Sequence, residues 1–307
     1  VLPRASESLA GRMEVLTLWP FSQGEIGGRT DRFVDACFSP GFEAKRLQAA
    51  AWPDLVARMV RGGFPEVQTR SGEDRRRAWF GAYVTTILER DVRDLANIQG
   101  LRDLPRLLRL TAVRAASLLN FADLARDAAL SHTTLHRYWA LLEAIFLARS
   151  LPAWSANLGA RLVKAPKVLM VDSGLLCHLA GLDAGRLKAD DLMTGNVLEA
   201  FVAGEIARQI TWSRARPALF HFRTHAHQEV DLLLEGADGR LVGIEVRKTA
   251  SPSAADFKGL RHLKEKTGKR FLRGILLYTG TESVGFGEDL YALPVSALWL
   301  LEPPGGE

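Results

Sequence analysis

The chain has 307 residues, of which 47% are hydrophobic, and it carries a formal net charge of +5 with a pI near 9.4. This length predicts two or three domains at the usual ~100–200 residues per domain, and the composition is that of a globular protein. The sequence contains no run of about 18 uncharged apolar residues, which excludes a membrane-spanning helix, while the basic charge permits a polyanionic partner such as DNA.

Two cysteines, Cys37 and Cys177, lie far apart in the sequence. Their separation offers no spacing typical of a metal site. Two inert thiols are typical of a protein in a reducing cytoplasm, which is the location we expect.

The first part of the chain predicts helices. Trp52 and Pro53 form a pair that commonly opens a helix, and Gly62 to Pro65 predicts a turn. Trp79 and Tyr83 then recur at helical spacing on a stripe that we expect to be buried. We therefore predict helical lid material in residues 30–60 and a separate helical segment at residues 61–115.

Residues 116–190 predict a winged helix-turn-helix. Phe121 begins a short helix, Ser131 caps a second helix, and a β-rich piece follows over 145–151 and 161–171. In this arrangement the second helix would face a DNA major groove and two lysines of the wing would contact phosphate; the residues concerned are His132, Thr133, His136 and Arg137, and then Lys164 and Lys167. The alternative is that the same surface packs against neighbouring elements or a protein partner.

A further helix is predicted over 194–206, with Thr194 as its possible cap. The stretch from Gly174 to Asp191, with three glycines and three aspartates, is our candidate linker into the C-terminal domain at residues 191–307.

Residues 229–247 predict a β-hairpin. Polar Glu229, Asp231 and Glu235 alternate with apolar residues, a second alternating run ends at Arg247, and a turn at 237–239 joins the two. In this register Asp231 lies opposite Glu245. Like charges at such positions repel one another, so a cation or a shared proton is expected between them. A slip of one residue would instead leave both acids in water at a sheet edge.

The order of elements around this hairpin is helix, three strands, helix and strand. The second helix is preceded by a capping box that begins at Ser253, and the last strand covers 271–278. This order predicts an α/β fold with a mixed central sheet.

Together these residues resemble a known family. Glu199 on a first helix, Asp231 on a second strand and Glu245 to Arg247 on a third are similar to the PD-(D/E)XK nuclease-like fold. The run from Gly62 to Glu66 through Asp231 to Val246 resembles a prokaryotic ATP-binding family whose members combine an AAA-type ATPase domain with a C-terminal domain of unknown function.

The resemblance implies a metal site. Asp231 and Glu245 would bind Mg²⁺, and Glu199 would complete or orient the site. The third motif residue in active nucleases of this fold is usually lysine, whereas this chain has Arg247. Because arginine keeps its proton, Arg247 could clamp a phosphate but could not act as a base.

The resemblance also concerns ATP. Leu9 to Arg12 and the residues after them are similar to the end of the family's ATPase core, but the phosphate loop G-x-x-x-x-G-K-[ST] is absent from the 307 residues. We therefore interpret residues 1–60 as a remnant of the ATPase core and its lid. ATP is expected only in a longer form that carries the phosphate loop.

Two functions remain open from the sequence. The first is a DNA-associated C-terminal part of an AAA-type ATPase, in which Glu199, Asp231, Glu245 and Arg247 support Mg²⁺-dependent phosphodiester cleavage. The second is a non-catalytic adaptor that binds DNA or a protein and has an inactive nuclease fold.

Overall fold

The computed structural model describes residues 16–91, 103–224 and 226–305. The expected ATPase segment from Leu9 to Arg12 lies outside these ranges. Among the described residues no helix is long and apolar enough to span a membrane.

The elements confirm the expected mixed α/β fold. The helices of the first half are α2 (Gln23–Ile26), α3 (Phe33–Phe38), α4 (Trp52–Arg61), α5 (Pro65–Gln68), α6 (Glu73–Thr86), the π-helical turn η1 (Ile87–Asp91), α8 (Leu104–Val113), α9 (Phe121–Ala128) and α10 (His132–Ala144). The helices of the second half are α11 (Leu158–Val163), α12 (Ser173–Ala180), α13 (Ala184–Ala189), α14 (Asp191–Ile210), the 3₁₀ turn η3 (Ala254–Phe257), α15 (Lys258–Thr267), the 3₁₀ turn η4 (Gly268–Arg270) and α16 (Ala297–Leu300). The strands are β1 (Ala148–Leu151), β2 (Lys167–Met170), β3 (Ala218–Arg223), β4 (Glu229–Glu235), β5 (Leu241–Arg247), β6 (Phe271–Tyr278), β7 (Val284–Gly285) and β8 (Leu290–Pro294).

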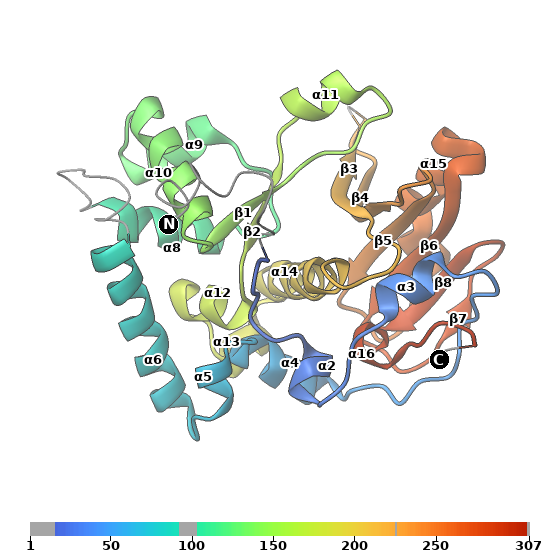
Figure 1. Cartoon of the computed structure of the whole chain (residues 1–307), viewed down its shortest axis with the longest axis horizontal. Coiled ribbons are helices and arrows are strands. Elements are labelled where there is room, and N and C mark those ends of the chain that lie inside the picture. The colour runs from blue at the N-terminus through green and yellow to red at the C-terminus, as the bar shows by residue number, and fades with distance from the viewer. Residues whose placement is uncertain (1–15, 92–102, 225, 306–307) are drawn as a thin grey trace, which may run out of the picture.

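Six strands form one sheet in the order β3-β4-β5-β6-β8-β7. The first three are antiparallel, β5, β6 and β8 are parallel, and β7 closes the edge antiparallel to β8. Helix α15 connects the parallel strands β5 and β6, as a crossover between parallel strands requires. Figure 1 shows this sheet on the right, with the helical half on the left and α14 running between them.

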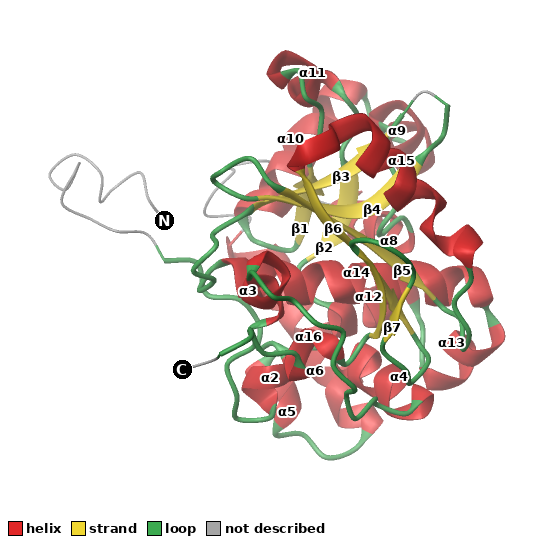
Figure 2. Ribbon diagram, turned by 90° about the vertical axis from the view of Figure 1, so that its right-hand side faces the viewer, coloured by secondary structure: helices red, strands yellow, loops and turns green. Residues whose placement is uncertain are grey.

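Each face of the sheet is buried under a helix. Leu232, Val242 and Ile244 belong to the large core that contains the apolar side of α14. Leu233 and Leu241 belong to a smaller core with Leu260 and Leu263 of α15, with α15 on the outer side of the sheet (Figure 2). Burial on both faces explains why the strands are nearly continuous runs of apolar residues.

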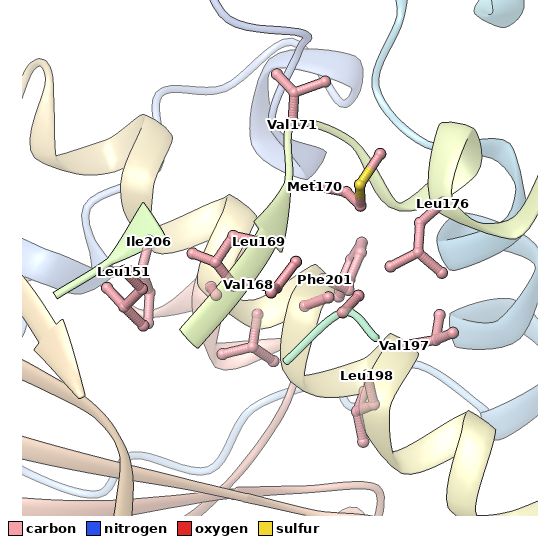
Figure 3. Close-up of a cluster of buried hydrophobic side chains, with 14 of the residues drawn as sticks. Leu151, Val168, Leu169, Met170, Val171, Leu176, Val197, Leu198, Phe201 and Ile206 are labelled. Atoms are coloured by element: carbon pink, nitrogen blue, oxygen red, sulfur yellow. The ribbon is translucent and has the colours of Figure 1, made fainter. Parts of the chain in front are cut away.

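The short pair β1 and β2 joins the helical half to the sheet half. The two strands are antiparallel, with Ala148 opposite Met170. Side chains of β2 pack on Val197, Leu198 and Phe201 of α14 (Figure 3). Burial of one such aliphatic side chain contributes about 1.5–3 kcal/mol, so this contact fixes β2 firmly beside α14.

Helices α9 and α10 are followed by the antiparallel strands β1 and β2, which is the order of elements expected for a winged helix. The side chain of Asn120 accepts hydrogen bonds at the start of α9, and that of Ser131 accepts one from the Thr134 N–H at the start of α10, as the capping preferences predict. The connection between the two wing strands contains α11, whose Leu158, Leu162 and Val163 are exposed.

Two sequence expectations about the region before the sheet are wrong. The stretch from Gly174 to Asp191 is not a linker, because α12 is buried against α4, α8 and α14 and α13 follows it. Thr194 does not cap α14. The helix begins at Asp191 with Asp190 as its cap, and the buried Thr194 hydroxyl donates to the carbonyl of Leu187.

Candidate functional site

The three acids singled out in the sequence come together in one cluster. Glu199 lies on α14, Asp231 near the start of β4, and Glu245 near the end of β5. The ladder between β4 and β5 pairs Leu232 with Ile244, which is the register predicted for the hairpin. Asp231 and Glu245 follow directly beyond that pair, so their side chains meet at the end of the ladder.

A β-bulge lies at Asp231. Phe220 pairs with Leu233 while Phe222 pairs with Val230, so His221 alone faces both Asp231 and Leu232. Bulges re-aim side chains and are frequent next to functional sites.

Lys167 of β2 is the central cation of the cluster. Its side chain is 3% exposed, and its Nζ lies 2.7 Å from Glu199 Oε1, 2.9 Å from Glu229 Oε1 and 3.4 Å from Asp231 Oδ1. From its place on the expected wing, Lys167 is predicted to contact DNA phosphate. The structure places it instead among three carboxylates, where its ammonium group is out of reach of a nucleic-acid groove.

Arg247 is the second cation. Its Nη1 lies 3.2 Å from Asp231 Oδ2, and its Nη2 lies 2.9 Å from Glu245 Oε2. The Val246 N–H donates a further hydrogen bond of 3.0 Å to Asp231 Oδ2. The Arg247 side chain is 44% exposed, so the cluster reaches the surface on this side.

Burial and charge divide the acids into two kinds. Although burial opposes it, the ion pairs with Lys167 and Arg247 hold the pKa of Asp231 below its usual range. Burial, and then the charge of Asp231, raise the pKa of Glu199 to about 8 and that of Glu245 well above its usual range. These shifts favour the ionised form of Asp231 and the protonated forms of Glu199 and Glu245, which reduces the repulsion among these three acids.

A glycine permits the close packing of this cluster. A Cβ atom at Gly259 of α15 would lie 2.0 Å from the carbonyl oxygen of Glu229 and 2.6 Å from Glu245 Oε1. Any larger residue would push α15 away from the ends of β4 and β5.

The arrangement does not fit a bound Mg²⁺. The oxygen donors are of the type that this ion prefers, but both oxygens of Asp231 are held by Lys167, Arg247 and the Val246 N–H, and Glu199 is held by Lys167. Within the described ranges, no group of three or more His, Cys, Asp or Glu residues is arranged to hold a metal ion. Lys167 and Arg247 lie beside Asp231 and Glu245, where the family resemblance implies a metal ion.

The predicted recognition residues lie at the start of α10. His132, Thr133, His136 and Arg137 are all exposed. The His136 ring stacks on Phe121 at a centroid distance of 4.1 Å, and His132 contacts His136 edge-on at 4.4 Å. These four side chains share one end of α10, which is the end that enters the groove in winged-helix proteins.

Lys164 lies at the base of the α11 loop rather than at its tip. Its Nζ is 3.4 Å from the carbonyl oxygen of Arg223, and its side chain is half-buried. Lys164 is therefore separate from the α10 surface and lies between the winged helix and β3.

Sequence patterns did not identify Glu229 and Lys167 as members of the acid cluster. Glu229 bridges Lys167 and Arg223, at 2.9 and 3.4 Å. Lys167 lies in this buried cluster, beside Glu199, and not on the exposed surface. The only signal in the sequence is a lysine in a short apolar strand, KVLM, where an unpaired charge is costly and a carboxylate partner is therefore required.

Two family descriptions match the chain. Residues 53–186 match "Domain of unknown function (DUF8612)", and residues 194–298 match "Domain of unknown function (DUF4143)". The first match covers most of the helical half and the wing, and the second covers most of α14 and the six-stranded sheet.

Two curated relatives have the same extent of similarity. They are the uncharacterized proteins Rv2008c of Mycobacterium tuberculosis and Mb2031c of Mycobacterium bovis, each 30% identical over 294 residues, which is 96% of this chain and 59% of the relative. The chain thus spans about three fifths of the length of these relatives. No solved structure matches the chain significantly. By these comparisons the chain carries two domains of unknown function and is similar along nearly its whole length to uncharacterized mycobacterial proteins.

Proposed function

We propose that this chain is the DNA-binding C-terminal part of an AAA-type ATPase and that its nuclease-like half binds DNA without cutting it. The observation that carries the proposal is the position of Lys167 in the acid cluster. A lysine of the winged helix neutralises carboxylates of the nuclease-like sheet and ties the two halves together.

Neutralisation of the acid cluster affects both DNA binding and DNA cleavage. Four acids, Glu199, Glu229, Asp231 and Glu245, would repel a phosphate backbone if their charge were uncompensated. Lys167 and Arg247 compensate two of those four charges and also occupy carboxylate oxygens that a catalytic metal would need. The same contacts therefore favour binding and oppose cleavage.

The exposed start of α10 is the proposed contact with DNA. Its histidines and Arg137 project from a capped helix, in a chain whose net charge is +5. A salt-dependent titration of duplex DNA by fluorescence anisotropy tests this surface. Each phosphate contact adds about −0.9 to the slope of log K against log salt.

The variant Arg137→Ala should weaken duplex binding, and if Arg137 contacts phosphate the salt slope should become smaller by about 1. Arg126→Ala is the matched control, because Arg126 is 72% exposed on the neighbouring helix α9 and pairs with Asp123. Equal losses in both variants, or binding that does not respond to salt, would contradict the proposed contact.

A second candidate function is Mg²⁺-dependent phosphodiester cleavage. One observation favours it. Active nucleases of this fold usually have a lysine where this chain has Arg247, and Lys167 brings a lysine ammonium group to the cluster from β2. Both cations would have to release carboxylate oxygens to the ion. A cleavage assay on linear and supercoiled DNA separates the two functions. Cleavage by the wild type that is lost in Asp231→Asn with Glu245→Gln would establish the second function and exclude the first.

ATP turnover belongs to the longer protein in this proposal. DUF4143 domains are often found with AAA-ATPase-like proteins, and the curated relatives are longer than this chain. We expect ATP binding only when a phosphate loop is present, and we place the protein in the cytoplasm because Cys37 and Cys177 are buried free thiols.

A further inference from the structure

A pocket lies next to the acid cluster, between the winged helix and β3. Its volume is about 320 Å³, at the lower end of the range of about 300–1,000 Å³ typical of small-ligand sites. Leu118, Ala153 and Ala165 contribute an apolar wall from the winged-helix side. Lys164 lies on the same side, and Arg223 and His227 face it from the sheet half.

The cations of this pocket are oriented by contacts with their neighbours. Arg223 Nη2 lies 3.0 Å from His227 Nδ1, and Arg223 Nη1 lies 3.4 Å from Glu229 Oε2. Lys164 forms no ion pair with any residue in the described ranges, and its Nζ donates a long hydrogen bond of 3.4 Å to the Arg223 carbonyl. The Lys164 ammonium group therefore keeps donors for a ligand.

The pocket is connected to the acid cluster through one side chain. Glu229 pairs with Arg223 on the pocket side and with Lys167 on the cluster side. Two larger hollows, of about 420 and 430 Å³, lie beside Arg214 and Trp299 and share no residue with the cluster.

We infer that this pocket binds one nucleotide unit, with its base or sugar against Leu118, Ala153 and Ala165 and its phosphate on Lys164 and Arg223. An inorganic phosphate would leave the apolar wall in water, and a nucleoside would bring no anionic group to Lys164 and Arg223. Only a ligand that has both parts satisfies both sides of the pocket. The inference deepens the proposed DNA function and rests on it for the source of the nucleotide.

Calorimetric titration of the whole chain with dAMP, deoxyadenosine and inorganic phosphate tests the pocket. We expect dAMP to bind at least about tenfold more tightly than either fragment, which corresponds to one charge-assisted hydrogen bond or a similar apolar contact. Equal affinity for dAMP and phosphate, or no binding of dAMP, would overturn the inference.

Two variants locate the site. Ala165→Trp fills the pocket from its exposed rim, and Ala156→Trp is its matched control because Ala156 is an exposed alanine of the same loop that does not line the pocket. Lys164→Ala removes the phosphate partner without disturbing an ion pair. Both Ala165→Trp and Lys164→Ala should weaken dAMP binding by about tenfold, and Ala156→Trp should leave it unchanged. Unchanged affinity in Lys164→Ala would overturn the inference even if Ala165→Trp does not fold.

A single-stranded oligonucleotide distinguishes a strand end from a free nucleotide. If the pocket receives the end of a DNA strand, the oligonucleotide should compete with dAMP, and the competition should be lost in Ala165→Trp. If it receives a free nucleotide, dAMP binds without such competition. Duplex binding through α10 is measured separately, so a wild type that binds duplex DNA but no dAMP would disprove the pocket alone, and the opposite result would disprove the α10 contact alone.

Discussion

Helix α14 carries two buried charge networks that differ in how their charges are satisfied. Toward its C-terminal end, Arg208 contacts Glu205 at 3.1 Å and Asp172 at 3.6 Å, and it donates to the carbonyls of Pro20 and Val171. Nearer its N-terminal end, Glu199 contacts Lys167. Both networks join segments that are distant in the sequence.

The first network is closed by the backbone. The oxygens of Asp172 accept from the N–H groups of Gly63 and Leu175, and Glu205 accepts from the N–H of Gln23. Backbone donors cannot move away without unfolding, which indicates a structural role. This network also explains the Gly62-Gly63 motif, since a Cβ atom at Gly62 would lie 2.1 Å from the Asp172 carboxylate.

Apart from the Val246 N–H that donates to Asp231, the acid cluster relies on side-chain cations. Lys167 and Arg247 hold most of its carboxylate oxygens, Arg247 is half-exposed, and a pocket adjoins Glu229. Side-chain cations can be rearranged by a ligand, whereas backbone donors cannot. The difference therefore identifies which of the two networks can respond to a ligand.

The largest loss of stability is expected for Arg208→Met. This change leaves Glu205 and Asp172 without their cation and two carbonyls without a donor, so the free energy of unfolding should fall by about 3–5 kcal/mol. Urea denaturation followed by circular dichroism measures the change. A loss smaller than that of Lys167→Met would contradict the structural role of this network.

Lys167→Met should cost less, about 2–3 kcal/mol at pH 8, because Arg247 and bound protons compensate part of the lost charge. The loss should shrink at pH 5, where the glutamates are more fully protonated. Lys164→Met is the control in the same segment, and it should change the free energy of unfolding by less than about 0.5 kcal/mol because Lys164 forms no ion pair with a described residue. Similar losses in the two variants would show that Lys167 does not hold the cluster together.

Gly259→Ala tests the close approach of α15 to the cluster. The added methyl group would collide with the Glu229 carbonyl and the Glu245 carboxylate, and we expect a loss of about 1–3 kcal/mol. Gly195→Ala in α14 is a matched control, because a Cβ atom there would meet nothing within 4 Å. That helix substitution should stabilise the protein by about 0.5–1 kcal/mol, so the two changes should have opposite signs. Melting temperatures of the two variants provide the comparison.

The last expected effect concerns pH. Burial, followed by the charge of Asp231, raises the pKa of Glu199 to about 8. Stability from the protonated group is therefore greatest below the ordinary glutamate pKa and falls as the pH rises toward 8, because the unfolded chain releases a proton that the native protein retains. The free energy of unfolding of the wild type relative to Glu199→Gln should decrease from pH 5 to 8, by at most on the order of 1 kcal/mol per pH unit. Glu265→Gln, at an exposed position, should show no such trend.

The sequence predicts much of the fold because the relevant signals are local. Alternation over 229–235 and 241–247, the capping residues Ser131 and Ser253 and the apolar strand at 271–278 depend on neighbouring residues, and all are present in the structure. Strands β7 and β8 were not predicted. The buried α12 was mistaken for a linker because its glycine and the aspartate before it are also typical of loops.

The candidate site was predictable only in part. The hairpin register places Asp231 near Glu245, and the family resemblance adds Glu199 from α14. The partner of these acids could not be found from local patterns, because Lys167 is 32 residues from Glu199 and 64 from Asp231. Only the packing of β2 on α14 brings its ammonium group into the cluster.

Anomalous diffraction from crystals soaked in Mn²⁺ tests the central claim most directly, since manganese binds where magnesium does. We expect no manganese peak between Asp231 and Glu245, with Lys167 Nζ still in contact with Glu199 and Asp231. A peak at those carboxylates, with Lys167 displaced from them, would contradict the proposal that Lys167 and Arg247 hold these acids in place of a metal ion.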